Sequence, residues 1–175
     1  MKAALDRECG LVHGKKMGST RGDSGSVKDV IRIVSSTPLF KGLEEEHVRM
    51  LARNARVSSY AAGEVIVRET DAARGFYMVA EGRVKLFKMS PDGREQTLFH
   101  FGFGVPFCLC ALFEGRAFLA NAAALEKSTV LFIPAEDLER LAMEEPSLLF
   151  NLVFLLARRL KETMEMVESL SIRSL

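Results

Sequence analysis

The sequence predicts an α+β fold in which helices precede and follow an antiparallel, jelly-roll-like β-roll. Three observations support this prediction. Apolar residues recur at helical spacing from residue 27 to about residue 55. Residues 56–134 then change to short β-rich runs separated by turn residues, which is typical of antiparallel barrels and sandwiches. After residue 134 the helical spacing returns and continues to the end of the chain.

Length and composition place the chain among ordinary globular proteins. Its 175 residues suffice for one domain with extensions, and 48% of them are hydrophobic and 27% charged. A net charge of +1 gives no global sign of nucleic-acid binding. The three cysteines, an odd number without disulfide spacing, favour a reducing compartment. Because the sequence shows neither a membrane-spanning apolar run nor a signal-peptide core, we expect a cytoplasmic protein without membrane contact.

The N-terminal part is predicted to contain a flexible tail and two helices. Residues 1–26 are rich in Gly, Ser, Lys and Arg and lack apolar periodicity, so they are expected to form the tail. The first helix is expected from Val27, and Pro38 ends its helical pattern. A second helix is expected from Glu44 to about Ala55, with an inner face formed by Val48, Leu51 and Ala52.

The β-roll is predicted from a series of short strands. Alternation of apolar and polar residues at 84–88 indicates a strand that is wet on one face. Pro91, Asp92 and Gly93 form a strong hairpin-turn signal directly after it. The expected strands are 57–60, 63–68, 75–79, 82–88 and 96–101.

The C-terminal part is predicted to form a short helix at 135–143 and a long helix from Pro146. Apolar residues recur along the long helix at alternating spacings of three and four, with Thr163 at one position of this seam. The seam could pack on the β-roll of its own chain, but it continues through the exposed-looking half of the helix, so a homodimer is expected. Residues 27–145 thus form the lead helices and β-roll, and residues 146–175 form the dimerisation helix, whose seam residues are Val153, Leu156, Leu160, Val167 and Leu170.

Residues 104–125 resemble the phosphate-binding cassette of a cyclic-nucleotide-binding β-roll. The scaffold positions of the cassette are kept by Phe107, Ala111, Leu112, Ala120, Ala122, Ala124 and Leu125. The positions that bind the ligand in that family are changed. Its Gly is Cys108, its Glu is Leu109, its Arg is Phe118 and its Ser or Thr is Leu119.

These changes disfavour a cyclic nucleotide. A buried cyclic phosphate needs a paired cation and convergent donors, which an Arg and a Ser supply and which Phe118 and Leu119 do not. Leu109 cannot accept a ribose hydroxyl as a Glu would. Backbone N–H groups at a helix start still attract an anion, so binding of cAMP or cGMP is weakened without being excluded.

The whole arrangement resembles the sensor half of the catabolite-activator/fumarate-nitrate-reduction family of bacterial transcription regulators. Besides the cassette, ordered landmarks within residues 37–134 carry the resemblance: Phe40-x-Gly42-Leu43, Gly63-Glu64-x-Ile66, Phe76-Tyr77-x-Val79-x-x-Gly82-x-Val84 and Asp92-Gly93. The resemblance implies a dimeric sensor for a small-molecule effector. It also implies DNA contact only through a helix-turn-helix domain. The sequence stops at Leu175, where the hinge would begin, so we expect that domain to be absent from this chain. The chain is then either an isolated or truncated sensor domain or a protein that works without DNA contact.

The resemblance implies further ligand positions on the long helix. The cAMP-binding members present a Thr and a Ser to the base across the dimer, and these positions align with Thr163 and Met164. One contact is therefore kept and one is lost. Thr163 could equally bond its own helix backbone. The expected pocket thus comprises Phe107, Cys108, Leu109, Phe118, Leu119, Ala120, Thr163 and Met164.

Cys108 is the candidate metal ligand named by the resemblance. The carbon-monoxide-sensing members of the superfamily carry Phe-Cys-x-His here, so the resemblance implies Cys108 as a haem thiolate, with Cys110 at the His position and His100 as a conceivable substitute. An iron–sulfur cluster is excluded for a single chain, because it needs four thiolates and Cys9 lies far away in the tail. Structural cysteines and a redox-switch thiol remain open as alternatives.

No catalytic motif is present, and His13, His47 and His100 are scattered, so the protein is not expected to be an enzyme. The sequence therefore predicts the effector-sensing domain of a bacterial transcription regulator. Its cassette is degenerate for cyclic nucleotides, and a haem, gas or redox signal is the expected input, although the cofactor itself is unknown. Two alternatives stay open: a genuine cyclic-nucleotide-binding domain with an atypical cassette, and a ligandless dimerisation module.

Overall fold

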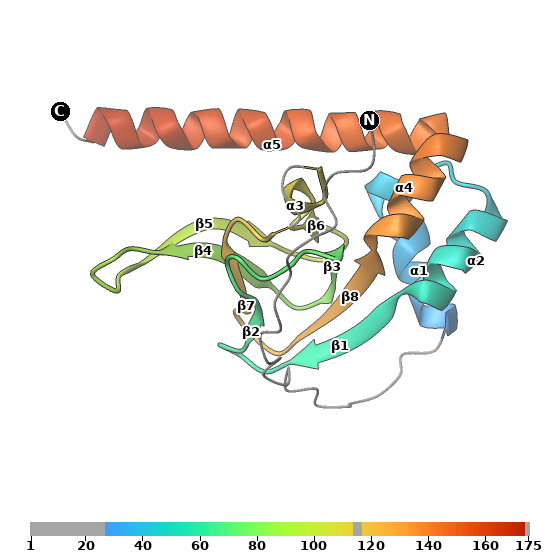
Figure 1. Cartoon of the computed structure of the whole chain (residues 1–175), viewed down its shortest axis with the longest axis horizontal. Coiled ribbons are helices and arrows are strands. Elements are labelled where there is room, and N and C mark those ends of the chain that lie inside the picture. Colours follow the sequence, from blue (N-terminus) through green and yellow to red (C-terminus); the bar gives the residue numbers. More distant parts are fainter. Residues whose placement is uncertain (1–26, 114–116, 174–175) are drawn as a thin grey trace, which may run out of the picture.

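The computed structural model of the chain describes residues 27–113 and 117–173. The expected tail at residues 1–26 lies outside the described residues. Eight strands form an antiparallel β-roll, helices α1, α2 and α4 gather at one end of it, and the long helix α5 runs along it as a rod (Figure 1). The structure thus confirms the predicted α+β fold.

The helices and strands that were expected from the sequence follow one another in the predicted order. The helices are α1 (Val27–Ser36), the 3-10 helix η1 (Pro38–Phe40), α2 (Glu45–Asn54), α3 (Cys110–Phe113), α4 (Ala135–Glu144) and α5 (Pro146–Arg173). The strands are β1 (Arg56–Tyr60), β2 (Val65–Val67), β3 (Gly75–Glu81), β4 (Val84–Met89), β5 (Glu95–Phe101), β6 (Pro106–Phe107), β7 (Asn121–Ala124) and β8 (Ser128–Pro134). No helix in residues 27–113 and 117–173 combines the length and the apolar character needed to span a bilayer.

Two four-stranded antiparallel sheets face each other in the roll. Their strand orders are β1-β8-β3-β6 and β2-β7-β4-β5. Strand β3 separates two hydrophobic clusters because its side chains alternate between faces. Phe76 and Met78 point to the cluster under the helices, whereas Tyr77 and Val79 point to the cluster between the sheets. Strand β3 is therefore covered by apolar side chains on both faces of its sheet.

The helices pack on the roll as their sequence pattern predicts. Val30 and Val34 of α1 are buried, as are Leu51 of α2 and Leu141 of α4. The first part of α5 joins this cluster through the buried Leu148 and Leu152, and the half-buried Leu155 packs against it. The rest of α5 therefore lies along the roll, where its attachment depends on individual contacts.

A tight corner of the roll depends on Gly82. Its φ of +80° belongs to the left-handed region that favours glycine. A Cβ at this position would lie 2.5 Å from the Ser128 hydroxyl, which itself accepts a hydrogen bond from the Arg83 N–H. The glycine thus allows β3 and β4 to turn closely over the start of β8.

Candidate functional site

The cassette crosses from one sheet to the other. Strand β6 pairs with β3, so that Phe107 lies opposite Tyr77. Cys108 follows with a φ of +64°, in the left-handed region, and α3 begins two residues later. This backbone conformation suits glycine, the residue that the resemblance places at position 108.

The returning part of the cassette is held by the loop between β2 and β3. The Thr70 N–H donates to the Phe118 carbonyl, and the Phe118 N–H donates to the Asp71 carbonyl, both at 2.9 Å. Ala72 and Ala117 form a β-bridge beside them. The backbone N–H at the expected cation position is therefore already engaged within the protein.

Aromatic rings fill the space between the sheets next to the cassette. We call Tyr77, Phe101, Phe107 and Phe118 the aromatic group. The ring centroids of Tyr77 and Phe107 are 5.5 Å apart, and those of Phe101 and Phe107 are 5.4 Å apart, both pairs being stacked. Phe118 joins through Tyr77, at 6.1 Å. Such ring pairs stabilise a core beyond their buried area, so this part of the roll is a packed apolar interior.

The structure places the expected cassette residues in different environments. Phe118 is only 6% exposed and lies in the aromatic group, whereas Leu119 is 55% exposed. Leu109 is buried, but in the cluster beneath the helices. Ala120 is buried at the entry to β7. The side chain of Leu112 lies outside the described residues.

Cys108 is a half-buried thiol with little tendency to ionise. Burial, with a smaller contribution from the nearby Cys110, raises the pKa of Cys108 to about 12. Tyr77 next to it has its pKa raised to about 12, also mainly by burial. Cys110 itself is exposed. A thiolate at Cys108 would therefore lack the positive surroundings that lower a cysteine pKa.

The described residues do not fit haem bound through Cys108. The thiol of Cys108 packs beside the rings of the aromatic group, and these rings fill the interior where a macrocycle would have to lie. His100 does not substitute, because it is exposed on β5 while its neighbour Phe101 points into the roll. Within the described parts of the chain, no group of three His, Cys, Asp or Glu side chains could hold a metal ion.

Arg159 connects α5 to the aromatic group. Its guanidinium carbon lies 4.8 Å from the ring centroid of Phe101 and 5.7 Å from that of Phe99. One guanidinium nitrogen also lies 2.6 Å from a carboxylate oxygen of Glu162. The sequence analysis assigned no role to Arg159. The available signal was its position one helical turn before Thr163.

The other α5 positions named from sequence lie away from the aromatic group. The Thr163 hydroxyl donates to the Arg159 carbonyl at 2.8 Å, which is the local backbone bond weighed above. Thr163 and Met164 are both exposed. The seam residues Val153, Leu156, Leu160 and Val167 are exposed as well, and the side chain of Leu170 lies outside the described residues.

Comparison with known proteins identifies related domains. The family model of the cyclic nucleotide-binding domain matches residues 57–145. The "Cyclic AMP receptor protein" of Thermus thermophilus is 34% identical over 129 residues, which are 74% of this chain and 60% of that protein. The "Transcriptional activator protein Anr" of Pseudomonas protegens is 32% identical over 111 residues, which are 62% of this chain and 44% of that protein.

A solved structure shows the same fold. The sensor domain of the transcriptional regulator DNR from Pseudomonas aeruginosa superposes with a TM-score of 0.71 at 21% identity, covering 79% of this chain and 93% of that domain. The chain thus matches most of an isolated sensor domain, but only 60% and 44% of the length of the two regulators above.

Proposed function

Because the chain belongs to the cyclic nucleotide-binding domain family of the catabolite-activator/fumarate-nitrate-reduction regulators, we propose that it senses an effector other than a cyclic nucleotide. The chain would act as the effector-sensing domain of a bacterial transcription regulator and not as an enzyme. Contact with DNA would require a further domain of that regulator. The greater length of the two related regulators supports this division of labour.

One observation carries the proposal: the side chain at the cation position of the cassette is a buried ring. Phe118 packs against Tyr77 in the interior, where a cyclic phosphate would need a cation. Burying an anion there without a paired cation costs several kcal/mol. The backbone N–H of Phe118 donates to Asp71 and so offers no compensation.

The contact between β5 and α5 favours an effector that has both an apolar part and an anionic group. Phe99 is half-buried and offers aromatic surface, Phe101 is buried behind it, and Arg159 above both rings offers a cation. An effector could bury apolar surface against these rings. Its anionic group could then replace the Glu162 carboxylate as the partner of the Arg159 guanidinium. A haem thiolate at Cys108 is not part of this proposal, because packed rings fill the interior beside that thiol. A redox switch is not part of it either, because the raised pKa of Cys108 keeps the thiol protonated.

The response would pass through α5 to a second copy of the chain. Arg159 touches the roll, while Leu160, the next residue, belongs to the exposed seam. An effector that moves Arg159 would therefore shift the seam on which two copies meet. This would bias a two-state dimer, which is how a ligand with different affinity for two states produces a signal.

The observation at Arg159 also favours a second candidate, a genuine cyclic-nucleotide-binding domain with an atypical cassette. In that case α5 would supply the cation that position 118 lacks. The double substitution Phe118→Arg with Leu119→Ser separates the two candidates. If the cassette is degenerate, these changes should tighten cAMP binding by about tenfold or more, because they restore the paired cation and the hydroxyl donor.

The experiment compares cAMP affinity of the wild type, the double variant and Leu119→Ser alone. Leu119→Ser alone is the matched control. Because Leu119 is exposed, this variant should fold normally, and it still lacks the cation at position 118. Circular dichroism checks that each variant is folded. Tight cAMP binding by the wild type, unchanged in the double variant, would contradict the proposal. A wild type stabilised by none of cAMP, cGMP and haem would instead favour a ligandless dimerisation module.

A further inference from the structure

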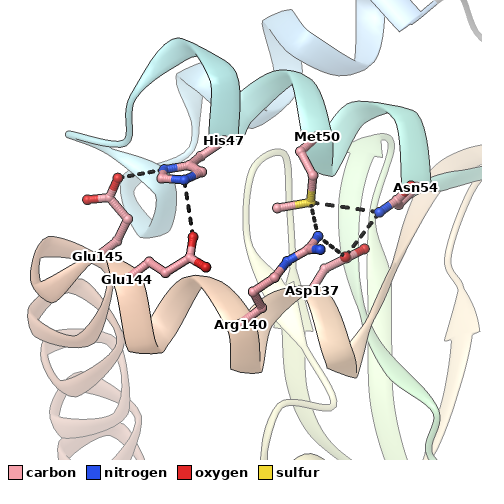
Figure 2. A network of polar contacts seen from close by, with 7 residues as sticks. All are labelled: His47, Met50, Asn54, Asp137, Arg140, Glu144 and Glu145. Atoms are coloured by element: carbon pink, nitrogen blue, oxygen red, sulfur yellow. Dashed lines mark hydrogen bonds and ion pairs between the residues drawn. The ribbon is translucent and has the colours of Figure 1, made fainter.

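Figure 2 shows the imidazole of His47 between two consecutive carboxylates at the end of α4. Its Nδ1 lies 2.6 Å from Oε1 of Glu145, and its Nε2 lies 3.4 Å from Oε2 of Glu144. The His47 and Glu145 side chains are only 23% and 14% exposed, so solvent screens their contact incompletely. The contact joins residues that are 98 positions apart in the sequence.

Glu145 is the elbow between α4 and α5. Its N–H closes α4 by donating to the Leu141 carbonyl at 2.8 Å, and its carbonyl accepts from the Leu148 N–H at 3.0 Å. Pro146 then begins α5. A side chain that holds Glu145 therefore holds the point from which the long helix leaves the helical cluster.

A second contact fixes the same end of α5. The Asn151 amide donates to the carbonyls of Leu39 and Lys41, at 3.1 and 2.8 Å. These bonds involve groups that do not titrate near neutral pH. Besides the packing of Leu148 and Leu152, the base of α5 is thus held by a polar contact that is independent of pH, at Asn151, and by one that is not, at His47.

The two carboxylates around His47 make its protonation state decisive. A neutral imidazole has one N–H and can donate to only one carboxylate, whereas an imidazolium donates from both nitrogens. The charged form also adds attraction to two negative groups, and charge-assisted hydrogen bonds are the stronger ones. Histidine side chains change charge near neutral pH more readily than any other side chain, so this is the contact at the base of α5 that pH can alter.

The neighbouring charges leave this assignment to His47. On α2, Arg49 pairs with Glu45 one turn away, while Glu44 and Glu46 are exposed. On α4, Arg140 pairs with Asp137, which also accepts from the Asn54 amide at 3.0 Å. Figure 2 shows that Asn54, Asp137 and Arg140 lie further along the same two helices. Both arginines are therefore engaged away from the imidazole.

We propose that the contact of His47 with Glu144 and Glu145 is a pH-sensitive latch at the elbow between α4 and α5. Protonated His47 closes the latch and fixes the start of α5, and loss of the proton loosens it. The proposal depends on the proposed function only in treating α5 as the helix that carries the response. The latch itself needs no effector.

Hydrogen exchange of the 175-residue chain tests the latch directly. Amide protection is measured at residues 145–152 at about pH 5.5 and about pH 7.5, after correction for intrinsic exchange rates. We expect protection in the wild type to fall by about fivefold at the higher pH, because one charge-assisted contact at a partly exposed site is lost. In His47→Gln the pH dependence should disappear. The matched control His100→Gln alters an exposed imidazole on β5 and should keep it.

Two results would overturn the proposal: protection in the wild type that does not change with pH, or an unchanged pH dependence in His47→Gln. If His47→Gln does not fold, Glu145→Gln serves instead, because it keeps the shape and removes the charge. Asn54→Ala loosens α2 from α4 at Asp137 without touching the imidazole, so it should lower protection equally at both pH values. No effector is present in these measurements, so failure of the latch and failure of the proposed function are separate outcomes.

Discussion

The guanidinium carbon of Arg159 lies 4.8 Å from the centroid of the Phe101 ring. This contact places a cation of α5 on the edge of the packed aromatic interior. Through this contact, a change inside the roll could move Arg159 and with it Leu160, the next residue, which belongs to the exposed seam of α5. The predictions below test this contact, the interior, the cysteines and the seam in turn.

Arg159→Gln should loosen α5 from the roll. The substitution removes a cation–π contact of a partly exposed guanidinium, which is worth about 1 kcal/mol. Arg158→Gln is the matched control, because Arg158 also pairs with Glu162 but is 78% exposed. Hydrogen exchange of residues 156–163 should show faster opening only in the Arg159 variant. Equal exchange in both variants would show that the ring contact does not hold the helix.

Phe118→Ala should destabilise the fold strongly. The ring is buried in the aromatic group, so its removal leaves a cavity and costs about 3 to 5 kcal/mol. Leu119→Ala at the adjacent exposed position should change the free energy of unfolding by less than about 0.5 kcal/mol. Urea denaturation measures both values. Similar small effects at the two positions would mean that the interior is not packed around Phe118.

Cys110 should react with iodoacetamide near pH 8 much faster than Cys108. Cys110 is exposed, whereas burial raises the pKa of Cys108 to about 12 and keeps its thiol protonated. Peptide mapping by mass spectrometry separates the two positions. Rapid labelling of Cys108 would reveal an accessible thiolate and would return haem and redox chemistry at this residue to consideration.

The same pKa shift predicts a loss of stability at alkaline pH. In the unfolded chain the Cys108 thiol ionises near its ordinary pKa of about 9, whereas in the folded chain it keeps its proton up to about pH 12. The folded state then binds more protons than the unfolded state, so the free energy of unfolding falls as pH rises through this window. Cys108→Ala should reduce that fall, measured by urea denaturation between about pH 8 and pH 10. An identical pH dependence in the variant would contradict the assignment.

Leu160→Glu should convert a dimer into a folded monomer. Leu160 is exposed on the seam, so the substitution removes apolar area at an interface without disturbing the core. Lys161→Glu introduces the same side chain at an exposed neighbour off the seam and should leave the dimer intact. Analytical ultracentrifugation measures the masses. A wild type that remains monomeric at high concentration would contradict dimerisation through α5.

Most helices and strands could be predicted from sequence because local patterns determine them. Helix α4 and the inner face of α2 agree with their apolar spacing. The pairing of β6 was not predicted, because two residues carry no strand pattern. Strand β7, with three consecutive alanines, was missed for another reason. Alanine has a low strand propensity, and pairing with β2 and β4 imposes the strand.

The candidate site could be predicted from the sequence less completely than the fold. The exchange of Arg for Phe at position 118 is visible in the chain, but its partner Tyr77 comes from a strand 41 residues earlier. Leu109 and Phe118 were expected in one pocket, yet one faces the helices and the other the roll. Which way a side chain points in a cassette depends on how β6 pairs with β3, and residue spacing alone does not contain that information.

The central claim, that the effector is not a cyclic nucleotide, is tested most directly by calorimetric titration of the wild-type chain with cAMP. Because a ring occupies the cation position, we expect no binding heat up to about millimolar cAMP, an affinity worth about 4 kcal/mol. Binding at micromolar concentration or tighter would contradict the claim. It would mean that Arg159 or backbone N–H groups hold the cyclic phosphate despite Phe118.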